Sequence, residues 1–296
     1  MQAHDPGTLA SPNRLERARR GLASWLLWTC FAAGGLVFSL IVFPGLLLLP
    51  VTEARRRRYA MALVHRGFGA LVSTCRAMGV IRFEIENAAR LRSLGRAIVI
   101  ANHPSYLDVV VLLSLMPRAC CIVTNRHWRN PLFAGIVRSA GYLRNDGGAS
   151  LVSASAAALT DDVPLIVFPE GTRSPARGRL GKFSRGFAHI SLTHGCPVVP
   201  VLIDCDPPIY TKQHRWHSVP PVRPTLRVRV LENDMALGDE TESEANVAQP
   251  PLTPVMPVMP VPPLPDGLIS VGARRLTTLA EGLFNEHISP NGFTRT

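Results

Sequence analysis

Lysine is nearly absent from this chain: of the 32 lysine and arginine residues, only Lys182 and Lys212 are lysines. Arginine therefore supplies nearly all of the basic charge, and the formal net charge is +11. Because the guanidinium fork binds oxyanions through paired hydrogen bonds, this bias suits phosphate and anionic headgroups. A genome composition that favours arginine would produce the same bias without a function. We expect no nucleic-acid partner, since no helix-turn-helix, zinc-finger or RNA-binding signature occurs.

Several familiar catalytic and metal-binding patterns are missing as well. The six cysteines form no Cys-x-x-Cys pair, which favours reduced core thiols in a cytosolic compartment over a disulfide framework. A Gly-x-Ser-x-Gly elbow is absent, which argues against a serine hydrolase. The chain has neither a glycine-rich nucleotide loop nor a convincing metal-ligand spacing among its histidines, so the sequence predicts no metal site.

One segment does stand out, because residues 21–51 carry no charged side chain. This length exceeds the roughly 20 residues that cross a bilayer. The segment is too long for a removable signal peptide and lacks the usual small-residue cleavage site. We therefore predict a membrane segment over residues 21–51, preceded by a basic arm over residues 1–20.

Arginines flank this segment on both sides, with Arg55–Arg58 directly after it. The positive-inside rule then favours both flanks on the cytoplasmic side. A re-entrant hairpin broken near Gly34–Gly35 or Pro44 satisfies that rule, as does an interfacial helix pair. A single span is the alternative, with Arg55–Arg58 at its cytoplasmic end. In each case we expect an inner-membrane protein whose catalytic part lies on the cytoplasmic side.

Residues 52–296 predict an α/β domain, because short apolar runs alternate with helical patterns. Fully apolar strands indicate a buried, mixed but largely parallel sheet flanked by helices. Residues 225–231 alternate apolar residues with Arg227 and Arg229, which suits a sheet edge. Residues 249–265 are dominated by proline and predict an extended strap or linker; residues 1–11 predict disorder. The predicted strands are 82–86, 97–101, 120–124, 165–168, 198–203 and 225–231, and the predicted helices are 55–79, 106–116, 131–140, 149–160, 183–194 and 268–288.

A histidine and a carboxylate follow the predicted strand 97–101, in the run Asn102-His103-Pro104-Ser105-Tyr106-Leu107-Asp108. The carboxyl end of a strand is where α/β sheets place their sites. With His103 in the turn and Asp108 one turn into the next helix, Asp108 can accept the Nδ1 hydrogen and leave Nε2 free as a base. Ser105 and Asp108 also match a capping box, so Asp108 has a second possible role at the helix N-terminus.

A second motif, Phe168-Pro169-Glu170-Gly171-Thr172-Arg173-Ser174, follows the predicted strand 165–168. In a parallel sheet it lies on the same rim as His103. Gly171 allows close backbone approach, and Thr172 and Arg173 offer donors to an anion. A surface turn with a solvated Glu170–Arg173 ion pair is the alternative for this motif by itself. Two such motifs on one rim, behind a membrane segment, favour a base and an anion-binding arginine in one site.

Together these segments resemble the glycerolipid acyltransferase family, specifically the bacterial 1-acylglycerol-3-phosphate O-acyltransferases. The resemblance covers roughly residues 80–209 and its most specific part is the Glu170 motif. One block departs from the family pattern, which usually ends there in an acidic residue followed by arginine; here the arginine comes earlier, at Arg144. That departure bears on the headgroup of the acceptor more than on the chemistry. The four blocks, in order, are Asn102–Asp108, Gly141–Asp146, Phe168–Ser174 and Val198–Val201.

The resemblance implies a membrane-bound O-acyltransferase with a glycerol-phosphate-acyltransferase-like fold. His103, oriented by Asp108, would take a proton from the hydroxyl of a lysophospholipid. The oxygen would then attack the thioester of acyl-CoA or acyl carrier protein. Neither a metal nor a cofactor is implied, and membrane lipids are the expected surroundings.

The resemblance also implies roles for residues that bind the two substrates. Arg173 would hold the phosphate of the acceptor, and Val198–Val201 would shape the donor side. Lys182 and Arg185 are secondary candidates for contact with phosphate or donor, with surface charge at a helix N-terminus as their alternative role, and Arg144 is a further substrate-binding candidate. The residues that would position the glycerol part are Glu170, Gly171 and Thr172.

Two other functions stay open at this point. The same chemistry could act on a lyso-aminolipid or another lipid alcohol, given the departure at Arg144. A non-catalytic, membrane-associated lipid-binding protein is the alternative from a different class. The presence of both His103 and Asp108 argues against that alternative.

Overall fold

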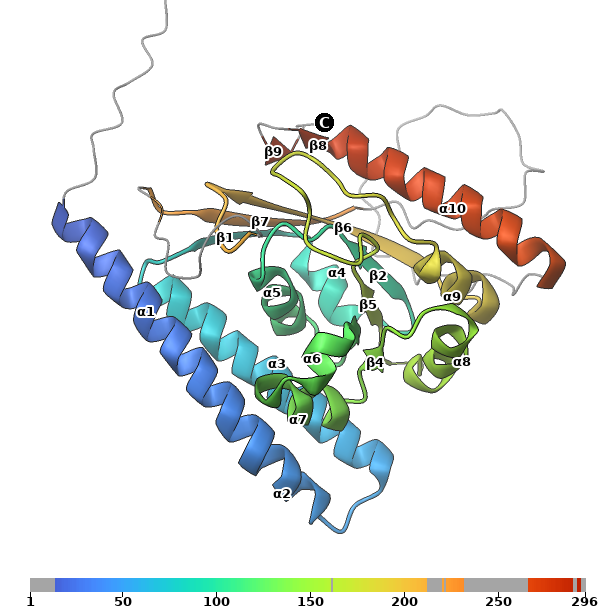
Figure 1. Cartoon of the computed structure of the whole chain (residues 1–296), viewed down its shortest axis with the longest axis horizontal. Coiled ribbons are helices and arrows are strands. Elements are labelled where there is room, and N and C mark those ends of the chain that lie inside the picture. The colour runs from blue at the N-terminus through green and yellow to red at the C-terminus, as the bar shows by residue number, and fades with distance from the viewer. Residues whose placement is uncertain are drawn as a thin grey trace, which may run out of the picture.

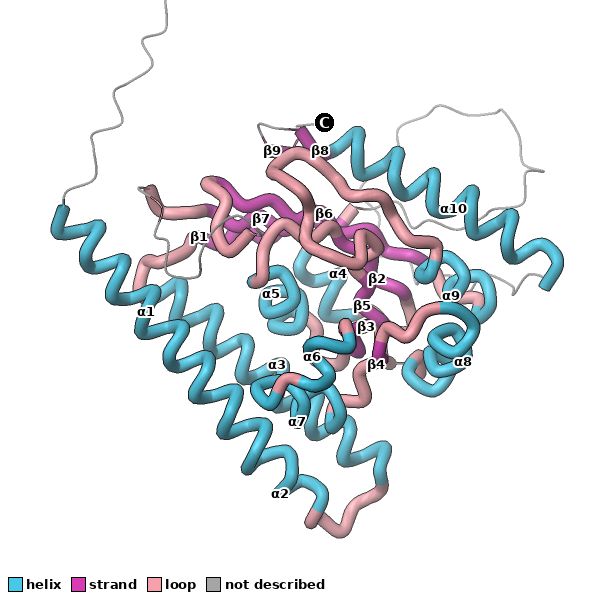
Figure 2. The backbone as a smooth tube through the Cα atoms, viewed as in Figure 1, coloured by secondary structure: helices cyan, strands magenta, loops and turns pink. Residues whose placement is uncertain are grey.

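The structure is a computed structural model that describes residues 14–160, 162–211, 220, 222–231, 266–289 and 292–293. The disorder predicted for residues 1–11 and the proline-rich strap predicted at 249–265 lie outside the described residues. Figures 1 and 2 show the described elements in one view.

The N-terminal part forms a helical hairpin (Figure 1). Helix α1 (Arg14–Val37), a π-helical turn (Phe38–Val42) and helix α2 (Phe43–Leu47) follow one another without a break. The chain reverses over residues 48–52 and returns as α3 (Glu53–Ala77). The helix therefore runs through Gly34–Gly35 and Pro44, where we expected an interruption. At the π-turn the Phe43 N–H bonds to the carbonyl of Phe38, and such a widened turn tolerates the missing N–H of the proline that follows.

The same π-turn seats the hairpin on the rest of the molecule. The hydroxyl of Ser39 accepts a hydrogen bond from the Gly135 N–H of helix α7 (Pro131–Ser139) at 2.8 Å. A Cβ at Gly135 would lie 2.5 Å from the Ser39 carbonyl oxygen, so only glycine permits this close crossing. The hairpin is thus packed against the α/β domain at a defined contact.

A twisted sheet of seven strands in the order β1-β7-β6-β2-β5-β3-β4 lies at the centre (Figure 2). The strands from β6 to β4 are parallel, β7 is antiparallel to β6, and β1 is parallel to β7. This arrangement confirms the predicted mixed, largely parallel sheet. The strands are β1 (Arg82–Glu86), β2 (Ile98–Ala101), β3 (Cys120–Val123), β4 (Leu143–Arg144), β5 (Leu165–Val167), β6 (Val198–Asp206) and β7 (Thr225–Val230).

Strand β7 is not at the sheet edge, so that prediction was wrong. Strand β1 lies outside it. Arg227 and Arg229 point to a partly exposed face, where they pair across the strands with Glu84 at 2.8 Å and Glu86 at 2.5 Å. The alternation of charged and apolar residues marks a half-solvated face of an inner strand, and opposite charges on neighbouring strands support it.

Helices cover both faces of the sheet (Figure 1). Helix α5 (Leu107–Leu115), with α3 packed against it, lies on one face, and α9 (Gly186–His194) and α10 (Asp266–His287) lie on the other. The predicted helices are confirmed, whereas the short helices α4 and α6 were not predicted. The remaining helices are α4 (Ala88–Ser93), α6 (Asn125–Arg129) and α8 (Gly148–Ala158), and a small hairpin of β8 (Ile288–Ser289) and β9 (Gly292–Phe293) follows α10.

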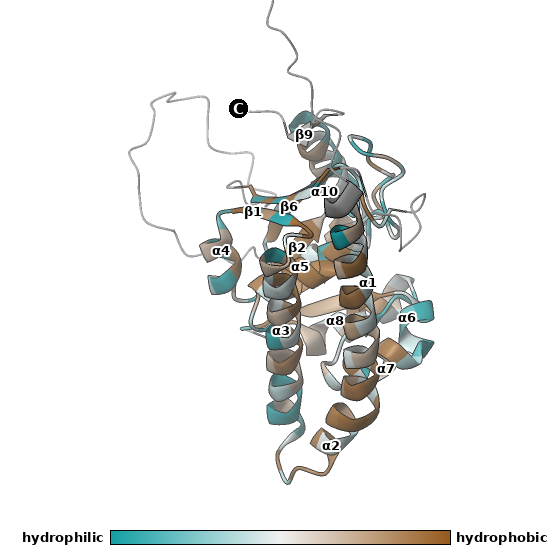
Figure 3. Ribbon diagram, turned by 90° about the vertical axis from the view of Figure 1, so that its left-hand side faces the viewer, coloured by the Kyte–Doolittle hydropathy of each residue, from teal (hydrophilic) through white to brown (hydrophobic). Residues whose placement is uncertain are grey.

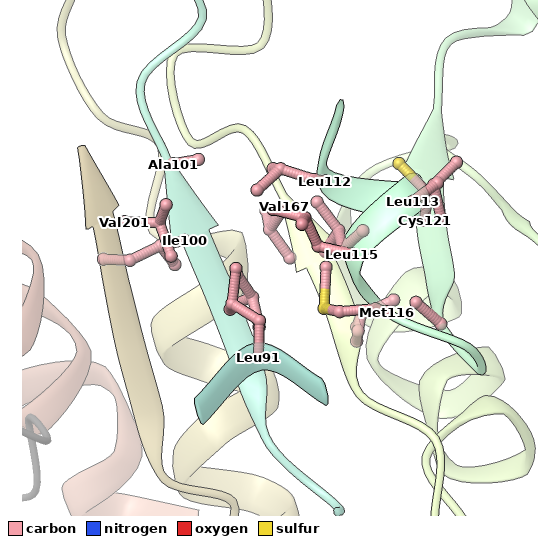
Figure 4. Packing of buried hydrophobic residues seen from close by; sticks show 14 of the residues in the cluster. Leu91, Ile100, Ala101, Leu112, Leu113, Leu115, Met116, Cys121, Val167 and Val201 are labelled. Carbon is pink, nitrogen blue, oxygen red and sulfur yellow. The ribbon is translucent and has the colours of Figure 1, made fainter. Parts of the chain in front are cut away.

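The core is densest around β2 and β5, whose strand residues are all buried. Figure 4 shows Leu112, Leu115 and Met116 packed against this part of the sheet. Both faces of these strands are apolar because helices cover both. The chain leaves β2 for α5 on one face and leaves β5 for α9 on the other. The gap between the carboxyl ends of β2 and β5 is thus the switch point where α/β sheets bind ligands.

Candidate active site

His103 and Asp108 meet at the carboxyl end of β2. The Nδ1 atom of His103 lies 2.8 Å from Oδ2 of Asp108. The same Oδ2 accepts the Ser105 N–H at 2.7 Å. Asp108 therefore closes the turn that leads into α5 and also orients the imidazole, so both roles considered for it are present. With Nδ1 engaged, Nε2 is the nitrogen left for chemistry.

The environment of this pair is apolar. Asp108 is fully buried, and its Oδ1 has no hydrogen-bond partner among the described residues. Burial raises the pKa of the Asp108 carboxyl above its ordinary value, and hydrogen bonds from His103 and Ser105 oppose that rise only in part. The His103 ring stacks on Phe168, with centroids 4.3 Å apart. The imidazole is thereby held at one end by a buried carboxyl and on one side by an aromatic ring.

Glu170 binds the backbone behind His103. Its Oε1 accepts the His103 N–H at 3.0 Å and the Ser174 hydroxyl at 2.6 Å. Its Oε2 accepts the Gly181 N–H at 2.6 Å. The Ser174 N–H in turn donates to the His103 carbonyl at 2.8 Å. The two motif loops are therefore tied to each other through a buried carboxylate, and Glu170 holds protein rather than facing an open site.

Arg173 lies on the same rim, in the segment that follows β5. Its Nη1 donates to the Tyr210 carbonyl at 3.0 Å. Its guanidinium carbon lies 3.8 Å above the Tyr106 ring, which is a cation–π contact. The Glu170–Arg173 ion pair considered from sequence is replaced by these contacts. Among the described residues these are the contacts of the guanidinium, which leaves donors for an anion.

A cavity of about 1770 Å³ opens beside His103. It exceeds the ~300–1,000 Å³ of ordinary small-molecule sites. Most of its lining is apolar and comes from several helices, among them α1, α3, α5, α7 and α8, and part of its polar lining lies at the rim of the sheet. The apolar lining includes Trp25, Trp28, Phe31, Phe68, Leu71 and Val109; the polar rim includes His103, Arg126, Thr172 and Arg173. The cavity therefore suits an amphiphile with a long apolar part and an anionic end.

This chain is similar in sequence and in fold to known proteins. Residues 82–204 match a family model described as Acyltransferase. The 1-acyl-sn-glycerol-3-phosphate acyltransferase alpha of Mus musculus is 26% identical over 218 residues, which cover 69% of this chain and 74% of that protein. The 1-acyl-sn-glycerol-3-phosphate acyltransferase of Cocos nucifera is 34% identical over 116 residues, which cover 36% of this chain and 37% of that protein.

The fold has a solved counterpart in the crystal structure of PlsC, the 1-acyl-sn-glycerophosphate (LPA) acyltransferase of Thermotoga maritima. The two chains align with a TM-score of 0.56 at 18% identity, over 91% of this chain and 97% of that one. This chain contains a domain of the acyltransferase family. The resemblance inferred from the motifs is confirmed, and the protein is an acyltransferase.

Within this acyltransferase, some of the other predicted site residues line the cavity and others do not. Gly171 and Thr172 line the cavity with Arg173. Gly171 has φ +63°, and a Cβ there would meet nothing within 4 Å. Its glycine is required by the backbone conformation and not by a close approach.

Arg144 is not brought to the cavity of the acyltransferase, because it pairs with Asp146 at 2.7 Å on the exposed strand β4. Lys182 and Arg185 are exposed, and neither lines the cavity. They lie on either side of Ser184, which does line it. Val198–Val201 is buried in β6 and shapes the core of the sheet.

Sequence reasoning missed two residues of this site. Arg126 lines the cavity from α6. It follows strand β3, whose carboxyl end shares the rim of β2 and β5, so its position after a predicted strand was an available signal. Tyr210 accepts from Arg173 and lines the cavity as well. No motif in the sequence marks it.

Proposed function

We propose that this acyltransferase moves an acyl chain from a thioester donor to the free hydroxyl of 1-acylglycerol-3-phosphate and so forms phosphatidic acid. The observation that carries the proposal is the placement of His103, bound to buried Asp108, beside Arg173 at the rim of a large apolar cavity. His103 can act as the base for a hydroxyl, the Arg173 guanidinium can bind a phosphate, and the cavity beside them can hold an acyl chain. The names of the relatives from Mus musculus and Cocos nucifera support the same acceptor.

In the reaction, Nε2 of His103 takes the proton of the acceptor hydroxyl as its oxygen attacks the thioester carbonyl carbon. A tetrahedral intermediate forms, the carbon–sulfur bond breaks, and the thiolate leaves. The proton on Nε2 passes to the sulfur, which restores neutral His103. Asp108 holds the Nδ1 hydrogen and stabilises the imidazolium in between. No acyl-enzyme is needed, because the base activates the acceptor directly.

The acceptor phosphate binds Arg173, with Thr172 as a further donor and Arg126 as a second cation across the rim. A guanidinium already stacked on Tyr106 loses little freedom when it binds two phosphate oxygens. Glu170 acts from behind: both of its oxygens hold backbone N–H groups of the motif loops. The glycerol part is therefore positioned by Gly171 and Thr172 at the cavity surface and only indirectly by Glu170.

The donor is acyl-CoA or acyl carrier protein. Both carry anionic groups, and Lys182 and Arg185 are exposed beside the cavity-lining Ser184. These two cations contact the donor outside the cavity while the thioester reaches His103.

The protein acts at the cytoplasmic face of the inner membrane. The helix over residues 18–47 is long and apolar enough to cross a bilayer. Figure 3 shows α2 and the adjoining part of α1 as hydrophobic and the start of α3 as hydrophilic. Leu22, Leu40, Ile41, Leu47 and Leu48 are exposed large apolar side chains of this segment. Such a patch on a soluble protein marks a membrane or partner surface. An interfacial helix pair keeps the cavity next to an acceptor that stays in the bilayer.

Purified wild-type protein, His103→Ala and Arg173→Ala, incubated with acyl-CoA or acyl carrier protein and a panel of lysolipids, test this function. Mass spectrometry of the products should show phosphatidic acid for wild type, and a loss of roughly 10²–10⁴-fold in turnover for His103→Ala. Arg173→Ala should raise KM for the phosphate acceptor more than for the donor. Arg173→Lys should restore little, since a point charge lacks the fork.

Three results would change the proposal. The alternative acceptor would be favoured if a lyso-aminolipid or lipid alcohol were the best substrate and KM for the acceptor were unchanged in Arg173→Ala. Equal effects of Arg173→Ala on donor and acceptor would remove Arg173 from the phosphate site. Full turnover in folded His103→Ala would show that His103 is not the catalytic base.

A further inference from the structure

Tyr210 lies where helix α1 meets the loops of the active site. Its side chain is buried, and its ring meets Trp28 of α1 edge to face, with centroids 5.2 Å apart and planes at 84°. Burial raises the pKa of the Tyr210 hydroxyl, and side-chain hydrogen bonds with Trp28 and Ser24 oppose the rise. The side chain of Tyr210 is thus part of the surface on which α1 packs.

The backbone of the same residue belongs to the catalytic rim. The Tyr210 carbonyl accepts Nη1 of Arg173 at 3.0 Å and the Tyr106 N–H at 3.4 Å. The ring of Tyr106 lies under the guanidinium of Arg173. Two groups therefore hold Arg173: the carbonyl of Tyr210 itself and the ring of Tyr106. The second is tied to the first, because the Tyr106 N–H donates to the same carbonyl.

The conformation of Tyr210 fits this double attachment. Its φ is +53°, and Asn87 is the other non-glycine residue with positive φ in the described part of the chain. A bulky aromatic residue rarely adopts the left-handed region, and such a residue persists where its surroundings determine it strongly. Here the ring is held by α1 and the carbonyl by the two motif loops, so a shift of one end is transmitted to the other.

We propose that Tyr210 is a positioning residue that makes the orientation of Arg173 depend on the packing of α1 against the catalytic domain. Helix α1 then does more than keep the protein at a membrane. When α1 is seated, the guanidinium is presented to the anionic end of the cavity. When α1 is displaced, the Tyr210 carbonyl moves and Arg173 loses its fixed orientation. This inference rests on the proposed function only in the experiment that measures KM for the acceptor.

The first test does not depend on activity. Phenylglyoxal modifies exposed, mobile arginines, and mass spectrometry of peptides gives the rate for each one. In detergent-solubilised full-length protein, Tyr210→Ala and Trp28→Ala should each raise the rate at Arg173 several-fold. Arg227, which is paired with Glu84 on the far strands, is the internal reference and should not change. Leu26→Ala, an exposed position on the same helix, should match wild type.

These rates also separate positioning from loss of fold. A rise at Arg227 together with Arg173 in Tyr210→Ala would show general unfolding, and Trp28→Ala, which leaves the loop sequence intact, then decides. Wild-type rates at Arg173 in both variants would overturn the inference.

The second test is a double-mutant cycle on kinetics. Tyr210→Ala should raise KM for 1-acylglycerol-3-phosphate by about tenfold, the lower end of the cost of losing one hydrogen bond to a charged group. KM for the donor should stay as in wild type. In an Arg173→Ala background, Tyr210→Ala should add nothing, because the two residues act as one unit. Equal losses for both substrates, additive to Arg173→Ala, would show a merely structural role. If wild type fails to acylate this acceptor, the proposed function fails, and the modification rates still decide the role of Tyr210.

Discussion

At the scale of single residues, one oxygen atom of Asp108 contacts both the turn before α5 and the proposed catalytic base His103. Oδ2 binds the Ser105 N–H and the His103 Nδ1, while Oδ1 is buried without a partner among the described residues. A carboxylate kept away from water in this way is costly to ionise, which is why its pKa is raised. The cost is acceptable where a proton must be shared with an imidazole during a reaction.

Asp108→Asn separates these two roles. The asparagine oxygen, in the place of Oδ2, can still accept both the Ser105 N–H and the Nδ1 hydrogen of His103, but a neutral amide no longer stabilises the imidazolium that forms during the reaction. We expect turnover to fall by roughly 10²–10⁴-fold, since the protonated base loses the carboxylate that stabilises it, while the protein stays folded. Initial rates and thermal unfolding of purified protein measure the two effects. Equal losses of rate and stability would leave Asp108 with a capping role only.

The stability of the same variant relative to wild type should depend on pH. Because the folded pKa of Asp108 is raised, its contribution to the free energy of unfolding is fully present below the unfolded pKa of ~3.9. That contribution is lost as pH rises through the folded pKa. Asp108→Asn lacks this loss, so its thermal midpoint relative to wild type should increase with pH over that range.

The site residues differ in how far they could be predicted. The His103–Asp108 contact follows from a strand, a turn and a helix that are close in sequence. The role of Glu170 could not be predicted, because its partners are backbone N–H groups that only the fold brings to it. Tyr210 left no signal, since its function depends on a backbone conformation and on a distant tryptophan. Contacts between residues close in sequence could be predicted, and contacts between residues that only the fold brings together could not.

At the scale of elements, α10 lies outside the matched residues 82–204 and yet holds a loop of the active site. Glu281 of α10 accepts the Phe183 N–H at 2.8 Å, and Phe284 meets the Phe183 ring edge to face. The Gly181 N–H, two residues earlier, binds Glu170. The helix predicted from amphipathic spacing is therefore a support for the segment that carries Lys182 and Arg185.

Glu281→Ala leaves the Phe183 N–H without its acceptor. We expect a loss of ~1–3 kcal/mol, which corresponds to a thermal midpoint lowered by roughly 2–10 °C in a domain of this size. Glu281→Gln keeps an acceptor oxygen and is the matched control, with a midpoint near that of wild type. Differential scanning calorimetry measures both. Two variants with the midpoint of wild type would mean that this hydrogen bond adds no stability.

Element boundaries show where sequence patterns mislead. The predicted strands and helices of the α/β domain were confirmed because apolar runs and helical spacing report burial directly. The break expected at Pro44 did not occur, since a π-turn absorbs the proline. The edge position expected for β7 was wrong, since charge alternation reports exposure of a face and not the absence of a neighbouring strand.

At the scale of the whole molecule, the apolar segment has two surfaces with different roles. Leu22, Ile41 and Leu48 are exposed and do not line the cavity. Trp28 and Phe31 do line it. The first surface suits a membrane and the second completes the site. This division revises the simple view that the segment is an anchor attached to an independent catalytic domain.

Two variants separate the surfaces. Deletion of residues 1–51 should release the protein from membranes, keep the far-UV circular dichroism of the sheet, and abolish turnover even in detergent, because the cavity loses one side and Tyr210 loses Trp28. The triple variant Leu22→Ser, Ile41→Ser, Leu48→Ser should also leave membranes, since burying each such side chain in an apolar medium contributes about 1.5–3 kcal/mol, but it should keep most of its turnover in detergent. Vesicle flotation and initial rates measure the two properties on the same preparations. A deletion variant that stays active in detergent would reduce α1 to an anchor, and a triple variant that loses turnover in detergent would contradict the division of the helix into two surfaces.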